Sequence, residues 1–144
     1  MDYFSNLTLE EKRKILNLQP SILKQLRSQI KTGDETHIVD QMGGPSYNQI
    51  IKKLSDEELD LLIKGMEASA AGDRLSNSQP LLAIEKYKEA AAILDWDEIA
   101  VMSIGCIYAN MGRNQEALEW LNKAYQLNPS NVRVKRNLEA LRSL

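Results

Sequence analysis

The sequence predicts an all-helical protein whose second half is built from repeated helical hairpins. Apolar residues recur at intervals of three and four along most of the 144 residues, which is the spacing of an amphipathic helix. Residues that start or stop helices separate these runs. Two stretches of the second half also share one pattern of glycines and alanines, which is the signature of a repeat architecture. No apolar alternation is bounded by hairpin turn pairs, so no sheet is predicted.

The composition limits the classes of function. The chain is 43% hydrophobic and 26% charged, as in an ordinary globular domain with a real core. Its formal net charge of −2 argues against nucleic acid or a membrane surface as partner, because both favour a strong basic excess. No basic segment followed by an apolar one opens the chain, and no apolar run approaches the length of a membrane span. A cytoplasmic location is therefore expected.

Local signals divide the first half into short helices. Thr8 and Glu11 have the form of a capping box, in which each side chain bonds the other's backbone N–H. Pro20 is expected to end one helix and open the next, and Gly33 to close that second helix. A loop is predicted at residues 43–45, followed by a short helix over residues 46–53.

Similar signals mark the helices of the second half. Ser55 and Glu58 form a second capping-box pattern, and Gly72 is expected to close the helix that follows. A polar loop over residues 75–79 then leads to a helix that starts at Pro80. The later helices are expected to begin at caps supplied by Asp95 or Asp97, by Asn114 and by Asn131.

The internal repeat is the most informative feature of the chain. Gly65 and Gly72 are seven residues apart, and Gly105 and Gly112 have the same separation. Each pair precedes a helix with two alanines around one larger side chain, namely Ala83, Tyr87 and Ala90, then Ala117, Leu121 and Ala124. Small residues at such positions allow two helices to cross closely, and the larger ones fill the space beside them.

This pattern resembles the tetratricopeptide repeat family. The second copy matches without gaps over residues 98–131, with matching residues at Ile104, Gly105, Tyr108, Gly112, Ala117, Ala124 and Pro129. The first copy, assigned to residues 58–97, differs in two ways. It carries about six extra residues around positions 76–80, and Asp95 replaces the terminal proline.

The resemblance implies a short helical solenoid of about two repeats with a capping helix at residues 132–144. The domain of repeats is placed at residues 54–144, preceded by a helical segment at residues 1–53. Part of that segment, residues 19–53, is either a degenerate third unit or a cap for the N-terminal end.

The family resemblance also implies a function, namely protein binding as an adaptor or small chaperone, without catalysis. In this family the first helix of each unit lines a concave groove. The corresponding positions here are Leu59, Leu62, Ile63, Met66, Ala70, Ile99, Met102, Ser103, Cys106 and Asn110. None is charged and most are apolar, so an open groove should be covered. The cover is an apolar or amphipathic partner segment, a second copy of the chain in a self-assembling scaffold, or residues 9–32. Alternatively, these side chains are simply core.

Other residue patterns indicate no catalytic, metal or cofactor site. His37 and Cys106 are the only residues of their types and lie in separate regions, so a Cys–His pair or a metal site is not expected. The carboxylates between Asp56 and Asp60 suit a helix N-terminus, where the helix dipole favours negative charge. A family clamp for chaperone tails would require Lys, Asn, Asn, Lys and Arg, and the matching residues are Leu62, Met66, Ser103, Arg133 and Asn137. Only Arg133 is compatible, so that role is rejected.

Overall fold

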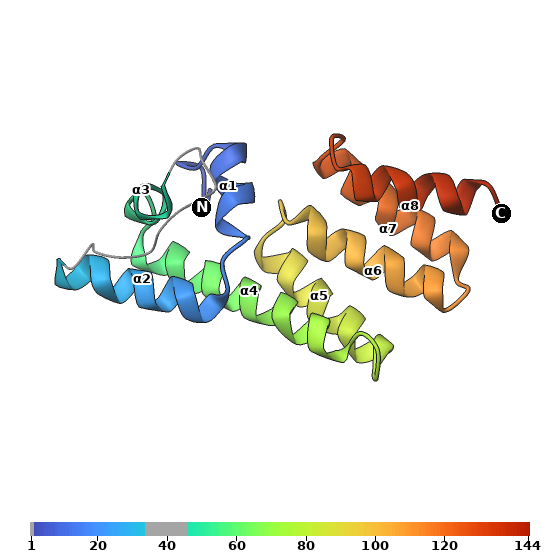
Figure 1. Ribbon diagram of the computed structural model, residues 1–144, viewed down its shortest axis with the longest axis horizontal. Helices are drawn as coiled ribbons and strands as arrows, with labels where there is room; N and C mark the ends of the chain where they lie inside the picture. The colour runs from blue at the N-terminus through green and yellow to red at the C-terminus, as the bar shows by residue number, and fades with distance from the viewer. Residues whose placement is uncertain (1, 34–45) are drawn as a thin grey trace. The chain divides into compact units, whose positions relative to one another are not determined.

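The computed structural model describes residues 2–33 and 46–144, and every regular element in these ranges is an α-helix (Figure 1). The helices are α1 Leu9–Ile15, α2 Pro20–Thr32, α3 Tyr47–Lys52, α4 Asp56–Leu75, α5 Pro80–Ile93, α6 Glu98–Asn110, α7 Asn114–Leu127 and α8 Val132–Arg142. The predicted all-helical fold is confirmed. The loop predicted at residues 43–45, and His37, lie outside the described residues.

The chain divides into two compact units, Met1–Met66 and Glu67–Leu144. The division falls inside α4, whose first half belongs to the first unit and whose last turns belong to the second. The repeat domain assigned to residues 54–144 from the sequence stays a prediction.

Two helices of the first unit, α1 and α4, begin with capping boxes. Thr8 and Glu11 bond each other's backbone N–H at the start of α1, at 3.1 and 2.9 Å, and Ser55 and Glu58 do the same at the start of α4, at 3.1 Å each. Both predicted capping boxes are therefore confirmed. Gly33 ends α2 with a φ of 79°, as expected of a glycine in the left-handed region. The buried apolar side chains include Phe4, Leu7, Ile15, Leu23, Leu26, Ile50, Ile51 and Leu54.

In the second unit each helix packs on the next along the chain. Helix α6 contacts α5, α7 and α8, and α7 contacts α8 (Figure 1). One core cluster joins α5, α6 and α7 through residues such as Tyr87, Ile104 and Ala117. A second cluster joins α6, α7 and α8 through residues that include Met102, Leu121, Ala124, Val134 and Leu138. Helix α6 is thus central to this unit.

Two glycines of the second unit do what the repeat pattern predicts. A Cβ built on Gly105 would lie 2.7 Å from Leu121 Cγ and 3.2 Å from the carbonyl oxygen of Ala117, so α6 and α7 cross too closely there for a side chain. Gly112 follows α6 with a φ of 78°, a conformation that an L side chain rarely adopts, and so allows the turn into α7.

The expectation that Gly72 closes its helix is wrong. Helix α4 continues through Gly72 to Leu75, and a Cβ on Gly72 would lie 2.8 Å from the ring of Tyr87. Gly72 is therefore a close-packing residue that faces Tyr87 as Gly105 faces Leu121. Only residues 76–79 separate α4 from α5, so the six-residue insertion is absent. A second correction concerns α7, where Asn114 is the first helical residue and Arg113 is the cap.

Candidate partner-binding face

One side of α6 presents a row of partly accessible side chains. Ile99, Ser103, Cys106 and Asn110 recur at intervals of four and three, so they share one face of the helix. Ile99 is 38% exposed, Asn110 is exposed, and Ser103 and Cys106 are half-buried. The other side of α6 packs into both core clusters. We call these four residues the α6 row.

Helix α8 flanks the α6 row on one side. The amide Nδ2 of Asn137 donates to Cys106 Sγ at 3.2 Å. Burial raises the pKa of the Cys106 thiol, and the nearby positive charge of Arg133 opposes this only in part. Because the thiolate is the reactive form, a thiol held neutral serves here as a small packing and hydrogen-bonding group.

Helices α4 and α5 flank the row on the other side. The hydroxyl of Tyr87 donates to the carboxylate of Asp73. Burial is the main cause that raises the pKa of Tyr87, and the bond to Asp73 adds to it. Ser103, which also interacts with the Tyr87 hydroxyl, donates its own hydroxyl to the carbonyl of Ile99 at 2.8 Å. The polar groups on this side are therefore held in place by one another.

The N-terminus of α6 fixes the position of the row. Asp97 accepts the backbone N–H groups of Ile99 and Ala100 at 3.1 and 3.2 Å, which confirms it as the cap among the two candidates. Glu98 accepts from Asn128 Nδ2 at 2.9 Å. Both carboxylates are buried. Burial raises the pKa of Asp97 to about 6, although its two backbone hydrogen bonds favour the charged form.

The remaining groove residues predicted from the sequence have other surroundings. Leu59, Leu62, Ile63 and Met66 belong to the first unit and are buried. In the second unit Met102 is 1% exposed, while Ala70 of α4 is half-buried. The buried side chains have a packing role, so the accessible members of the predicted set are Ala70 and the α6 row.

Two flanking residues are missing from the predicted set. The parallel spacing of the two glycine pairs matches Gly65 to Gly105, and this leaves Asp73 outside the predicted set. With Gly72 matched to Gly105, Asp73 matches Cys106. The repeat pattern predicts only a packing role for Tyr87, and nothing in the sequence indicates that its hydroxyl reaches Asp73.

Comparison with known protein families agrees with this geometry. The family model of the tetratricopeptide repeat matches residues 100–131. The chain therefore carries a tetratricopeptide repeat over these residues. The matched residues extend through α6 and α7 to the turn before α8, and they confirm the second repeat predicted over residues 98–131. No curated protein matches the chain. Repeats of this kind generally mediate protein–protein interaction, and the match supports an interaction module.

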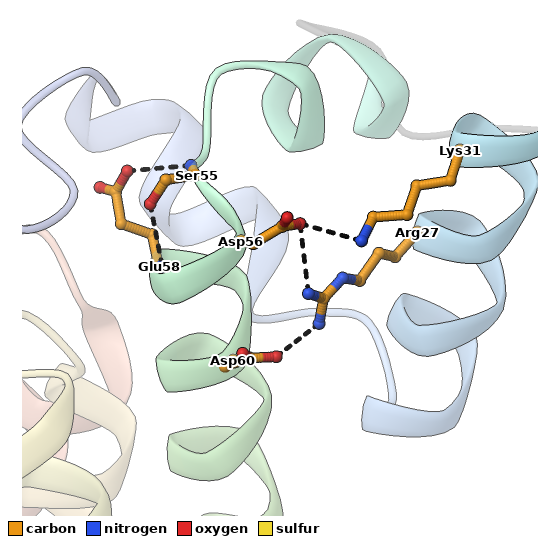
Figure 2. Close-up of polar contacts among 6 residues, drawn as sticks. All are labelled: Arg27, Lys31, Ser55, Asp56, Glu58 and Asp60. Carbon is orange, nitrogen blue, oxygen red and sulfur yellow. Dashed lines mark hydrogen bonds and ion pairs between the residues drawn. The ribbon is translucent and has the colours of Figure 1, made fainter.

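The first unit holds a cluster of ion pairs (Figure 2). Arg27 of α2 reaches Asp60 at 2.5 Å and Asp56 at 3.2 Å, and Lys31 reaches Asp56 at 3.1 Å. Figure 2 shows both cationic side chains extending from α2 toward the first turns of α4. The charges hold α2 against α4, and the proximity of Lys31, followed by that of Arg27, lowers the pKa of Asp56.

The two other carboxylates at the start of α4 bind the N-terminal segment. Glu57 accepts the hydroxyl of Tyr3 at 2.6 Å, and Glu58 accepts the backbone N–H of Phe4 at 2.6 Å. Phe4 is only 2% exposed and has a φ of 67°, so the chain is anchored there in an unusual conformation. Every carboxylate between Asp56 and Asp60 therefore has a structural partner.

Within residues 2–33 and 46–144, no group of three potential His, Cys, Asp or Glu ligands is placed to hold a metal ion. No helix in the same ranges is both long and apolar enough to cross a membrane.

Proposed function

We propose that this protein binds an amphipathic peptide segment of a partner along the α6 row of its tetratricopeptide repeat. The observation that supports this is the make-up of the row, in which an exposed apolar residue, Ile99, precedes the polar residues Ser103 and Asn110 on one face. A peptide with apolar and polar side chains at matching intervals complements such a face. Because the other side of α6 lies in the core, the row is presented on a rigid support.

The side chains of the row also suit close approach by a peptide. Ser103 and Cys106 are small, so a partner backbone can lie near α6. The exposed amide of Asn110 has donors and an acceptor to offer, and Asn137 retains a second N–H beside its bond to Cys106. Hydrogen bonds to these groups would fix the orientation and register of the peptide on α6. Contact with Ile99 would add to its affinity.

The same face could instead join two copies of the chain in a self-assembling scaffold. Such an assembly would use the α6 row of both copies, whereas an adaptor would remain monomeric without its partner. Light scattering over a range of protein concentrations separates these functions.

The test uses substitutions at exposed positions, so that the fold is kept. Peptides are selected from a displayed random library on the wild-type chain, and their affinities are measured by fluorescence anisotropy. The variant Ile99→Lys with Asn110→Lys should weaken binding at least about tenfold, or about 1.4 kcal/mol. The control Leu81→Lys alters an apolar side chain on α5 that is 59% exposed and should change affinity less than about twofold.

Circular dichroism confirms that both variants keep the helix content of the wild type. If the selected peptides bind the double variant as tightly as the wild type, the α6 row is not the peptide-binding site. Concentration-dependent dimers that dissociate in the double variant would favour the scaffold function over the adaptor.

A further inference from the structure

A second surface of the unit, separate from the α6 row, combines an aromatic ring with two positive charges. The ammonium groups of Lys123 and Lys88 lie over the ring of Trp120, at 4.4 and 5.5 Å from its centroid. Both lysines are exposed, and Trp120 is half-buried. Lys88 belongs to α5, while Trp120 and Lys123 belong to α7. We call these three residues the Trp120 cluster.

Packing of the repeat does not require a tryptophan at this position. Ala83 and Tyr87 of α5 take the same places as Ala117 and Leu121 of α7, 34 residues later. By that offset, Trp120 takes the place of Lys86, a charged residue that is half-buried. Part of the indole packs on both core clusters, so the ring is held firmly while its remaining surface is accessible. Tryptophans placed in this way are frequent at the centres of protein interfaces.

The charges of the cluster are not neutralised within the described part of the chain. Neither Lys88 nor Lys123 is in an ion pair there, although Lys86 pairs with Glu89 on α5, and Arg113, the cap of α7, pairs with Glu116. Two ammonium groups that share one ring repel each other, and the attraction of each to the indole offsets this only partly. A negative group from outside the chain would relieve the repulsion.

We propose that the Trp120 cluster binds an acidic segment of a partner protein. Carboxylates of that segment contact Lys88 and Lys123, and an apolar side chain lies against the accessible part of the indole. Glu119, one turn before Lys123, limits the net positive charge around the cluster. Recognition therefore rests on direct contact with two lysines rather than on a long-range field, which favours a short acidic peptide over a nucleic acid.

The test follows the indole N–H signals of the full-length chain by ¹⁵N nuclear magnetic resonance. The probe is the capped peptide Glu-Glu-Phe-Glu-Glu, and the matched control replaces each glutamate by glutamine. The acidic peptide should shift the signal of Trp120 but not that of Trp96, and its affinity should fall as salt is added. Trp120→Phe assigns the two signals by removing one.

Paired variants decide whether these two lysines are the site. Lys88→Gln with Lys123→Gln should weaken binding at least tenfold. The control Lys64→Gln with Lys135→Gln makes the same charge change at two other exposed lysines and should keep the affinity within twofold. Equal losses in the two pairs, equal binding of the glutamine peptide, or no shift at millimolar peptide would each overturn the proposal. A single-stranded oligonucleotide of equal charge that bound more tightly would overturn the choice of a peptide.

The result is independent of the α6 row. The variant Ile99→Lys with Asn110→Lys should bind the acidic peptide as the wild type does. Loss of binding in that variant would place the acidic segment on α6 and overturn the Trp120 cluster as its site.

Discussion

Leu121 occupies the space that a side chain at Gly105 would need. A Cβ on Gly105 would lie 2.7 Å from Leu121 Cγ and 3.2 Å from the backbone oxygen of Ala117. The first of these atoms is the branch point of a fully buried side chain, and the second belongs to the backbone of α7. Neither can move freely, so the absence of a side chain at Gly105 is a condition for the close crossing of α6 and α7.

The first prediction is that Gly105→Ala destabilises the protein. Overpacking lowers the free energy of unfolding by about 1–3 kcal/mol. The higher helix propensity of alanine offsets at most about 1 kcal/mol of this loss. The free energy of unfolding, measured by urea titration with circular dichroism, should therefore fall. In a Leu121→Ala background the same change should cost less, because the clashing atoms are gone. An equal cost in both backgrounds would show that this contact is not the cause.

The second prediction concerns the turn after α6. Gly112 has a φ of 78° and nothing within 4 Å of a built Cβ, so only backbone strain opposes a side chain there. Gly112→Ala should lower the free energy of unfolding by about 1–2 kcal/mol. Gly112→Asn should lower it less, since asparagine tolerates the left-handed region better. Equal stability of the alanine and asparagine variants in thermal denaturation would contradict the strain explanation.

The third prediction is a pH dependence that originates at Asp97. Burial raises its pKa to about 6 in the folded protein, against an ordinary value of 3.8. Above about pH 6 the buried carboxylate lowers the free energy of unfolding. Between the two values the folded chain binds a proton that the unfolded chain releases, so this cost disappears as the pH falls from about 6 to about 4. The difference corresponds to at most about 3 kcal/mol.

Asp97→Asn tests this because asparagine keeps a capping oxygen but does not titrate. The free energy of unfolding at pH 4, 5, 6 and 7 should rise toward acid more steeply in the wild type than in the variant. At pH 7 the variant should be at least as stable as the wild type. Parallel profiles for the two proteins would assign the titration to other groups.

The fourth prediction has the opposite sign and concerns the first unit. Burial disfavours ionisation of Glu58, but hydrogen bonds from Ser55 and from the Phe4 backbone outweigh it and hold the pKa below 4.5. The carboxylate therefore stabilises the fold above pH 4.5, and this stability is lost as the pH falls through the lowered value. Glu58→Gln should cost about 1–2 kcal/mol at pH 7 and little at pH 3.

Chemical unfolding at pH 7 and pH 3 measures the effect of Glu58→Gln. Hydrogen exchange at the amide of Phe4 should also accelerate in this variant. The control Glu57→Gln, which alters only the exposed bond to Tyr3, should cost less than about 0.5 kcal/mol at either pH. Similar costs for the two substitutions would mean that the bond to Phe4 adds little.

The helix starts in this chain could be predicted because capping is a local interaction. Thr8 and Glu11, like Ser55 and Glu58, satisfy each other's backbone within three residues, so their pattern needs no knowledge of the fold. The second repeat could be predicted for a related reason. Its small and large residues keep the family spacing without a gap, and close helix crossing depends on that spacing.

Accessibility along the predicted groove could not be derived from the sequence. Ile99 and Met102 are both apolar and three residues apart on α6, yet Ile99 is 38% exposed and Met102 is 1% exposed. Helical spacing gives only the relative directions of two side chains on one helix. Whether each side chain meets water or another helix depends on the neighbouring elements, here α7 and α8, whose side chains surround Met102 in the second core cluster.

Gly72 and Gly112 show where sequence and tertiary structure each decide. Both follow a run of helical residues, so the sequence determined that each lies at a tight point of a repeat. Gly112 ends its helix in the left-handed region, whereas Gly72 stays within α4 with the ring of Tyr87 against it. Glycine permits a sharp turn and a close contact alike. Only the position of Tyr87, 15 residues later on another helix, decides between them, and that position is a property of the packed structure.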